Sequence, residues 1–113
     1  MADQCLFCRI VRREIPATIV EETPEYLAFR DINPQAPVHV VIVPKTHVAS
    51  LSEATDPSSL GGLIGVAAGV AKREGLAEPG YRFVINTHRD GGQTVFHLHA
   101  HLLGGRHMTW PPG

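Results

Sequence analysis

The sequence predicts a single α+β domain built on an antiparallel sheet, and three observations carry this prediction. Short segments rich in β-branched and aromatic residues follow one another with only brief turns between them. One longer segment, residues 58–74, repeats apolar residues at the three- and four-residue spacing of a helix that faces a core. The length of 113 residues fits one compact domain over residues 1–113. Strands in series with a single long helix are typical of an α+β arrangement.

Each element is predicted from its own local pattern. Residues 5–14 are expected to form a short helix that Pro16 ends. Strands are expected, in chain order, over residues 18–22, 26–31, 38–43, 81–86 and 97–103. Pro44 is expected to stop the third strand, and Gly75 to stop the long helix. The Gly- and Pro-rich tail over residues 104–113 is expected to be irregular.

The composition is that of an ordinary globular chain. Hydrophobic residues make up 43% and charged residues 19%, and the formal net charge is −1, which gives no electrostatic case for nucleic acid or an anionic membrane as partner. The first residues lack the basic start and apolar run of a signal peptide, and no apolar stretch approaches the ~20 residues that span a bilayer. We therefore expect a cytoplasmic protein with reduced cysteines.

Three histidines alternate with apolar residues near the end of the chain. On a strand, His97, His99 and His101 would share one face, with neighbouring imidazoles roughly 7 Å apart. The simplest alternative is a surface strand that happens to carry histidines, but strict alternation of three favours a function. A metal site on the three imidazoles is a second functional alternative.

A polar, Gly-rich loop over residues 90–94 lies directly upstream of these histidines. Its glycines permit close approach of backbone N–H groups and the Thr94 hydroxyl to an anion. Asn86, at the end of the preceding predicted strand, adds an amide. Such a loop alone is more often a simple turn, but its position before the histidines predicts a phosphate site.

Cys5 and Cys8 have the spacing of half a zinc site. A redox pair is one alternative, although the strand-to-helix context expected for such a pair is missing. Two inert thiols on a short helix are another. His47 and His97 are candidate third and fourth ligands, and a set of two cysteines and two histidines would be a closed structural site.

The sequence resembles the histidine triad (HIT) superfamily, whose defining motif is matched throughout residues 97–103. The similarity extends to the Hint branch, the histidine triad nucleotide-binding proteins. The further matching segments cover residues 13–17, 31–37, 43–45, 90–93 and 110–113. The resemblance implies a HIT-like fold: a five-stranded antiparallel sheet with one long and one short helix, dimerising into a ten-stranded sheet.

The resemblance also implies an activity. It indicates hydrolysis or transfer of purine nucleoside 5′-phosphoramidates (AMP- or GMP-type nucleotides) through a nucleotidyl-histidine, with a probable role for structural zinc and no catalytic metal required. The alternatives are dinucleoside polyphosphate hydrolysis of the Fhit type, which the ending over residues 110–113 disfavours, and a nucleotide-binding regulatory protein with weak turnover.

Site residues follow from the same resemblance. His99 would be the nucleophile, and His39 would lie behind the site and support the triad. Asp31 would take the ribose hydroxyls. The phosphate and leaving group would be held by Asn86, Gly92, Gln93, Thr94 and His101. Base and sugar would be enclosed by Leu6, Phe7, Ile10, Phe29, Ile32 and Val41. Thr94 stands where the best-known members carry serine, and its β-branch restricts the rotamer of the hydroxyl.

Overall fold

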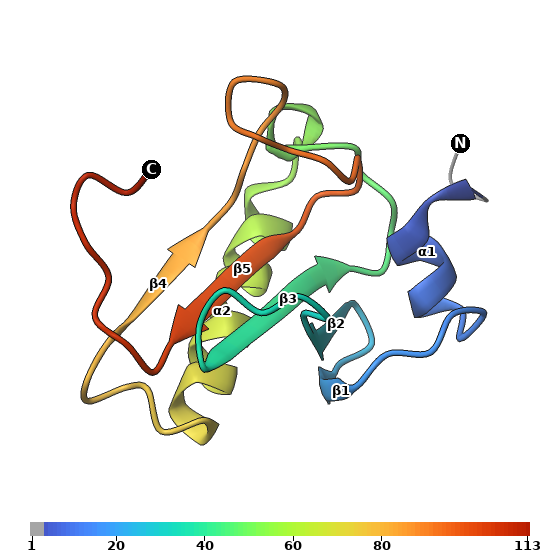
Figure 1. Ribbon diagram of the computed structural model, residues 1–113. Coiled ribbons are helices and arrows are strands. Elements are labelled where there is room, and N and C mark those ends of the chain that lie inside the picture. Colours follow the sequence, from blue (N-terminus) through green and yellow to red (C-terminus); the bar gives the residue numbers. More distant parts are fainter. Residues whose placement is uncertain (1–3) are drawn as a thin grey trace.

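Five strands form one antiparallel sheet in the order β1-β2-β3-β5-β4, in a computed structural model that describes residues 4–113 (Figure 1). The strands are β1 Ile19–Glu22, β2 Tyr26–Arg30, β3 Val38–Pro44, β4 Tyr81–Val84 and β5 Ala100–Gly104. The last strand in the chain is therefore inserted between β3 and β4. The predicted α+β class and five-stranded antiparallel sheet are confirmed.

The long helix α2, Pro57–Arg73, covers one face of this sheet (Figure 1). Asp56 caps its first turn by accepting from the Ser58 N–H, and Pro57 occupies the first helical turn, where its missing N–H costs nothing. Gly75 follows the helix with φ +76°, which confirms it as the stop. Buried α2 residues pack on the alternate strand residues that point to this face, Ala28, Val40, Ile42, Ala100 and Leu102.

The opposite face carries the second core and the short helix α1, Leu6–Val11. Phe7 and Ile10 of α1 pack on the other alternate set of strand side chains. That set comprises Leu27, Phe29, Val41 and Val43. Since strand side chains alternate between faces, His39 and His101 also lie on the α1 face.

Two element boundaries differ from prediction for identifiable reasons. Helix α1 ends at Val11, well before Pro16, because Arg13 takes the left-handed conformation with φ +64°. Strand β5 begins at Ala100 and not at residue 97, because the Leu98 N–H donates to the Val48 carbonyl (2.6 Å) instead of to β3. Leu98 still points to the α2 core.

Smaller differences occur elsewhere. Strand β4 stops at Val84, two residues short of the prediction, and β3 includes Pro44, which pairs with Tyr26. One turn of 3-10 helix, η2, covers Leu51–Glu53. Between residues 4 and 113, no helix has both the length and the apolar character needed to cross a bilayer.

Candidate active site and metal centre

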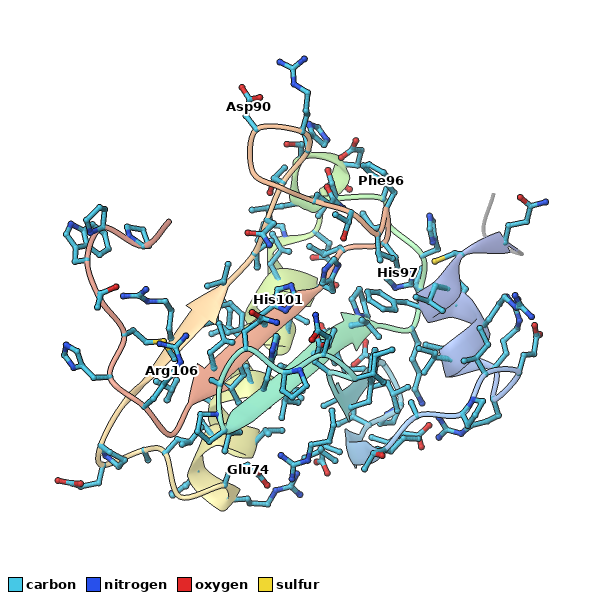
Figure 2. The ribbon with its side chains drawn as sticks, viewed as in Figure 1. Glu74, Asp90, Phe96, His97, His101 and Arg106 are labelled. Atoms are coloured by element: carbon cyan, nitrogen blue, oxygen red, sulfur yellow. The ribbon has the colours of Figure 1, made fainter. Side chains whose placement is uncertain are left out.

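The histidine row lies on the α1 face of the sheet, with His101 on β5 and His97 nearer to α1 (Figure 2). His99 immediately precedes β5, and its ring lies 5.0 Å from that of His101 between centroids. His39 reaches the row from β3, with its ring centroid 5.1 Å from that of His101. Phe7 of α1 packs edge-on against His99 at 4.9 Å. The fold therefore gathers three imidazoles under one aromatic ring.

The protonation of His99 is set by the backbone. Its Nδ1 lies 2.8 Å from the His97 carbonyl oxygen, which can only accept, so Nδ1 carries the proton. The neutral ring then has its lone pair on Nε2. The ring is buried and is held by Phe7 and by this hydrogen bond. His99 is thus a fixed imidazole with one unprotonated nitrogen free of intrachain hydrogen bonds among the described residues.

A second hydrogen-bond chain sets the protonation of His101. The Gln35 N–H donates to His39 Nδ1 at 3.0 Å, so the neutral His39 ring carries its proton on Nε2. That Nε2–H donates to His101 Nδ1 at 2.9 Å and lies 3.4 Å from the Asp31 carboxylate. His101 is left with its proton on Nε2. His99 and His101 therefore present opposite groups, a lone pair and a donor.

Burial keeps these rings uncharged. It lowers the pKa of His99 below the usual value, against smaller opposing effects of the His97 carbonyl and the Asp31 carboxylate. Burial, together with the neighbouring His99 and His39, lowers the pKa of His101 to about 4. The pKa of His39 is lowered by burial as well, with Asp31 opposing. At neutral pH the row therefore works with lone pairs and neutral N–H donors.

A cavity of about 250 Å³ opens between α1 and the strands beside His99. The residues expected to enclose base and sugar and to take the ribose all line it: Leu6, Phe7, Ile10, Phe29, Asp31, Ile32 and Val41. Ile32 is 98% exposed at its rim, an unusual state for a large apolar side chain. Sequence reasoning missed the roles of Ile15, Ala17 and Val95, which also line the cavity; the first two lie in a segment matched to the family without a role.

The loop residues expected around the phosphate are distributed differently. Asn86 shares a hollow with His101, whereas Thr94 is exposed beside Cys5 and His47. Gln93 is buried, and its amide bonds to the Ala49 and Val95 carbonyls and to the His88 N–H. The N–H groups of Gly92 and Gln93 bond to the carbonyls of Arg89 and His88. The structure thus gives Gln93 a role in holding the loop, and the predicted phosphate contacts stay predictions.

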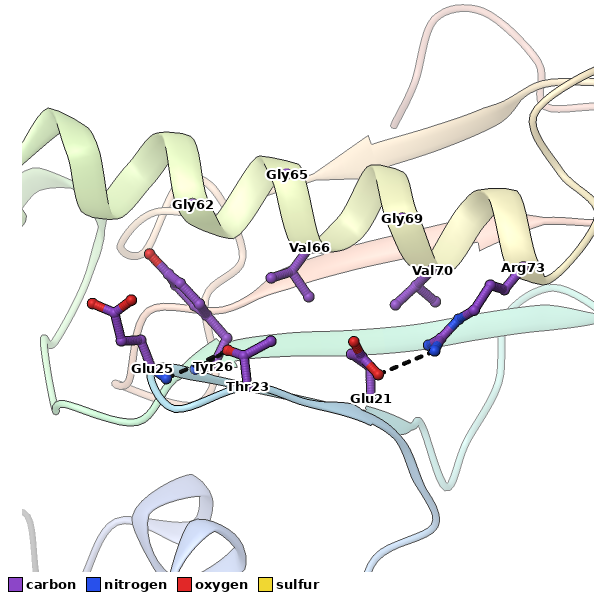
Figure 3. Close-up of a pocket in the computed structure, with 10 residues that line it drawn as sticks. All are labelled: Glu21, Thr23, Glu25, Tyr26, Gly62, Gly65, Val66, Gly69, Val70 and Arg73. Atoms are coloured by element: carbon purple, nitrogen blue, oxygen red, sulfur yellow. Dashed lines mark hydrogen bonds and ion pairs between the residues drawn. The ribbon is translucent and has the colours of Figure 1, made fainter.

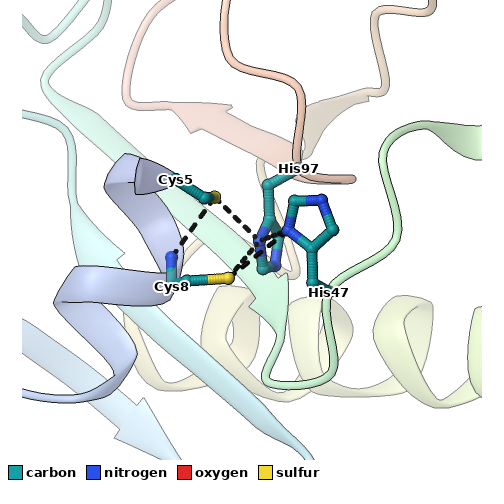
Figure 4. Close-up of side chains that lie close together, drawn as sticks. All are labelled: Cys5, Cys8, His47 and His97. Carbon is teal, nitrogen blue, oxygen red and sulfur yellow. Dashed lines mark hydrogen bonds between the residues drawn. The ribbon is translucent and has the colours of Figure 1, made fainter. Parts of the chain in front are cut away.

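The four expected metal ligands converge at the end of the histidine row (Figure 4). His97 Nδ1 lies 3.3 Å from Cys5 Sγ, 3.5 Å from Cys8 Sγ and 3.2 Å from His47 Nδ1, and Cys8 Sγ lies 3.4 Å from His47 Nδ1. In a tetrahedral zinc site with Zn–S about 2.3 Å and Zn–N about 2.0–2.1 Å, neighbouring ligand atoms lie roughly 3.3–3.8 Å apart. Donor types and spacings therefore fit zinc.

The surroundings of this cluster support the same conclusion. His97 Nε2 donates to the Pro44 carbonyl at 2.8 Å, which leaves Nδ1 unprotonated and aimed at the cysteines. The Cys8 N–H donates to Cys5 Sγ at 3.4 Å. Burial and the neighbouring Cys5 raise the pKa of Cys8 to about 11, so its thiolate needs a cation to form at neutral pH. The alternative of one metal on all three triad histidines is not supported, since His97 faces the cysteines.

Two other features do not form a metal or catalytic site. Asp31, His39 and His101 are close enough to share an ion, but the hydrogen bonds described above already join their facing atoms. The largest hollow, about 470 Å³, lies between α2 and the β1–β2 hairpin, where glycines of α2 carry no side chain (Figure 3). It is an open groove without histidine or cysteine, away from the α1 face.

Comparison with known proteins agrees with this arrangement. The chain is 49% identical to the purine nucleoside phosphoramidase of Escherichia coli K12, over 94% of this chain and 91% of the relative. It is 53% identical to the 14 kDa zinc-binding protein of Zea mays, over 96% of this chain and 87% of the relative.

Solved structures show the same fold. The HIT family hydrolase of Legionella pneumophila superposes with a TM-score of 0.94 at 53% identity, covering 96% of this chain and 99% of that one. A Zn-bound histidine triad family protein of Mycobacterium smegmatis superposes with a TM-score of 0.82 at 34% identity, covering 94% and 78%. The HIT domain family matches residues 12–108. This chain, with its histidine row, nucleotide-sized cavity and HIT fold, is a member of the HIT family.

Proposed function

We propose that this protein hydrolyses purine nucleoside 5′-phosphoramidates through a nucleotidyl-histidine on His99. The observation that carries the proposal is the hydrogen bond from His99 Nδ1 to the His97 carbonyl (2.8 Å), which leaves the Nε2 lone pair free in a buried ring. A neutral, fixed imidazole is a competent nucleophile toward phosphorus. The name of the E. coli relative, at 49% identity, supports the substrate class.

The cavity beside His99 suits a nucleoside. Its walls are the apolar side chains of α1, β2 and β3, with Asp31 as the acid among its lining residues. Asp31 Oδ1 is used to accept from the Asn33 N–H (2.8 Å), while Oδ2 lies within 3.4 Å of His39 Nε2. We assign the base to the apolar wall and the ribose hydroxyls to the Asp31 carboxylate, which retains lone pairs for them.

The first step forms the His99 Nε2–P bond and breaks the P–N bond of the substrate. The electron pair of the P–N bond goes to nitrogen, which takes a proton delivered from water and leaves as the amine. His101 Nε2–H donates a hydrogen bond to the phosphoryl oxygens, and its ring remains neutral because burial holds its pKa at about 4. The Thr94 hydroxyl and Asn86 amide are assigned to the phosphate and the leaving group.

In the second step, water attacks the same phosphorus and the Nε2–P bond breaks. His99 recovers its lone pair, the water proton passes to solvent, and the nucleoside monophosphate is released. The Nδ1 proton stays on the His97 carbonyl throughout, so the nucleophile needs no tautomer change between steps.

Zinc is assigned a structural role only. Cys5, Cys8, His47 and His97 would hold it as a closed four-ligand set, with no open position for water or substrate. Bound zinc supplies a cross-link between α1, the segment after β3 and the segment before β5. The names of the zinc-binding relatives from Zea mays and Mycobacterium smegmatis support this assignment.

Trapping of the covalent intermediate tests the proposal. Wild-type protein is mixed with an adenosine 5′-phosphoramidate, quenched in base, digested and examined by mass spectrometry. We expect adenylylation of the peptide that contains His99 and its loss in His99→Gly, with AMP binding retained. His107→Gly, at an exposed histidine of the tail, is the matched control and should keep both adduct and turnover. Near wild-type turnover in His99→Gly would refute the nucleophile assignment.

A further inference from the structure

A hollow of about 290 Å³ lies over β4 and β5, and His101 lies at its edge. Asn86, Arg82 and Arg106 also line it, and so does the C-terminal segment around Met108. Figure 2 shows Arg106 beside β4, in the direction away from α1. The nucleoside cavity lies under α1 and shares none of these lining residues. The chain thus has space on both sides of the reacting histidines.

The charge in this hollow is uncompensated. Within residues 4–113, Arg82 and Arg106 are the arginines without a carboxylate within ion-pair distance, and none of the residues lining the hollow is acidic. The remaining arginines all have acidic partners, namely Arg9, Arg12, Arg13, Arg30, Arg73 and Arg89. Two guanidiniums facing one hollow repel each other unless an anion joins them.

Backbone carbonyls hold both guanidiniums in place. Arg106 donates to the Gln35 carbonyl from Nε (3.2 Å) and Nη2 (3.1 Å), and to the His107 carbonyl from Nη1 (3.2 Å). Arg82 donates to the Thr109 carbonyl from Nη2 at 2.9 Å. Neutral acceptors fix the direction of a guanidinium without cancelling its charge. Because each has five N–H donors, both retain unused donors for an anion.

Resting on the proposed function, we propose that this hollow is the leaving-group subsite and that Arg82 and Arg106 select amines that carry a carboxylate. The substrates would be nucleotides joined through a P–N bond to the nitrogen of an amino acid. Displacement at phosphorus places the leaving nitrogen opposite His99 Nε2, and His101 and Asn86 connect the phosphate position to this hollow. A planar guanidinium recognises a carboxylate through two parallel hydrogen bonds.

A purely structural role for the two arginines is the competing explanation. Tying down the Thr109 and Gln35 carbonyls needs donors and not charge, so glutamine would serve it. The charge is what the structural role does not use. Arg82→Gln and Arg106→Gln therefore separate the two explanations, since each keeps an amide donor and removes one charge.

The experiment compares two substrates that differ only in charge, the adenosine 5′-phosphoramidates of glycine and of glycinamide. The measured quantity is the ratio of their kcat/KM values, so that a general loss of activity cancels. We expect each arginine variant to lower the glycine-to-glycinamide ratio by roughly tenfold, as for loss of a charged hydrogen bond. Arg82→Lys should restore part of the ratio. Arg73→Gln, which removes one charge from α2 outside this hollow, should leave the ratio unchanged.

The outcomes distinguish this proposal from the proposed function. Unchanged ratios with both substrates still hydrolysed would overturn the subsite and leave His99 chemistry intact. If wild-type protein forms no His99 adduct with either substrate, the proposed function fails, and calorimetric dissociation constants of the two compounds on the same variants decide the subsite. Diadenosine tetraphosphate is the third arm: if only its turnover falls in the arginine variants, the hollow binds phosphate and the carboxylate assignment is wrong.

Discussion

His99 and His101 are neighbours on one face of the sheet, yet their hydrogen bonds give them complementary chemistry. A backbone carbonyl takes the Nδ1 proton of His99, and His39 donates to Nδ1 of His101. One ring therefore exposes a lone pair and the other an N–H. The difference arises from two backbone groups, the His97 carbonyl and the Gln35 N–H, and not from the identity of the rings.

The pH dependence of turnover should reflect the burial of His99. Because burial lowers its pKa, protonation removes the nucleophile only at a pH below the usual value for histidine, about 6.5. We expect kcat/KM to remain on its plateau at pH 6.5 and to fall at lower pH. Initial rates between pH 4 and 8 measure the limb. A half-maximal rate at or above pH 6.5 would contradict a buried, neutral nucleophile.

Asp31 should distinguish ribose from deoxyribose. In Asp31→Asn the side-chain oxygen can still accept from the Asn33 N–H, but the charge that we assign to the ribose hydroxyls is lost. We expect ribonucleotide affinity to fall by roughly 10–100-fold, the effect of a charged hydrogen bond, and 2′-deoxynucleotide affinity to fall much less. Calorimetric titration with AMP and 2′-deoxy-AMP measures both. Equal losses would show that Asp31 serves another purpose, such as orienting His39.

Sequence reasoning predicted the side chains of the site better than the backbone groups that control them. The cysteine spacing and alternating histidines identified a metal set whose members the structure brings together. The Pro44 carbonyl that orients His97 and the Gln35 N–H that orients His39 left no signal. Every residue carries such groups, and only the register of the folded strands decides which ones meet a ring.

At the scale of elements, α1 is too short to be stable by itself. A helix of six residues, Leu6–Val11, forms few internal hydrogen bonds, and isolated helices under about 12 residues are marginal in water. Its position depends on Phe7 and Ile10 in the second core and on the cluster that includes Cys8. Phe7 also touches His99, so the position of α1 affects the nucleophile directly.

The double variant Cys5→Ser/Cys8→Ser should therefore loosen α1. We expect loss of bound zinc, a lower melting temperature and weaker AMP binding, with His99 still able to form the adduct. Elemental analysis of untagged protein, thermal melts and AMP titration measure these effects, and wild-type protein treated with a chelator is the control. Zinc well below one equivalent per wild-type chain after refolding with metal would defeat the assignment. Zinc retained by the double variant would place the metal elsewhere.

Element boundaries were predicted less well than element identities. Pro16 was the expected end of α1, but a left-handed Arg13 ends the helix earlier. The alternation from residue 97 correctly separated the core-facing Leu98 from the histidines, but β5 pairs only from Ala100. Periodicity reports which face a residue occupies. It does not report whether a neighbouring strand is present to pair with it.

The whole molecule should be a twofold-symmetric homodimer. Strand β4 is an edge of the sheet with one paired side, and Ile64 of α2 and Tyr81 of β4 are 54% and 42% exposed. Pairing of two β4 edges, with the α2 helices in contact, would cover this surface and yield a ten-stranded sheet. Sedimentation should show a dimer at micromolar concentration.

A single charge should break this assembly. Ile64→Glu is expected to give a monomer, because the carboxylate would be buried without a partner at the α2 contact. Leu51→Glu, at another exposed apolar residue on η2, is the matched control and should remain dimeric. A monomeric wild type, or an Ile64→Glu protein that stays dimeric, would count against this interface.

Strand order was the feature of the whole fold that the sequence did not predict. The alternating patterns indicated five strands and an antiparallel sheet, but hydrophobic periodicity contains no information about which strand lies beside which. The placement of β5 between β3 and β4 depends on contacts between residues about 60 positions apart, such as His39 with Leu103 and Val40 with Leu102. Such pairings follow from the packing of both faces at once.

This strand order has a consequence for protein synthesis. A chain leaving the ribosome delivers β1, β2, β3, α2 and β4 first, yet β4 has no partner in the sheet until β5 arrives. The fourth metal ligand, His97, and the proposed nucleophile, His99, emerge with that same last segment. Nascent chains interrupted before residue 100 should therefore bind neither metal nor nucleotide in the native manner, and catalytic competence should appear abruptly as translation nears its end.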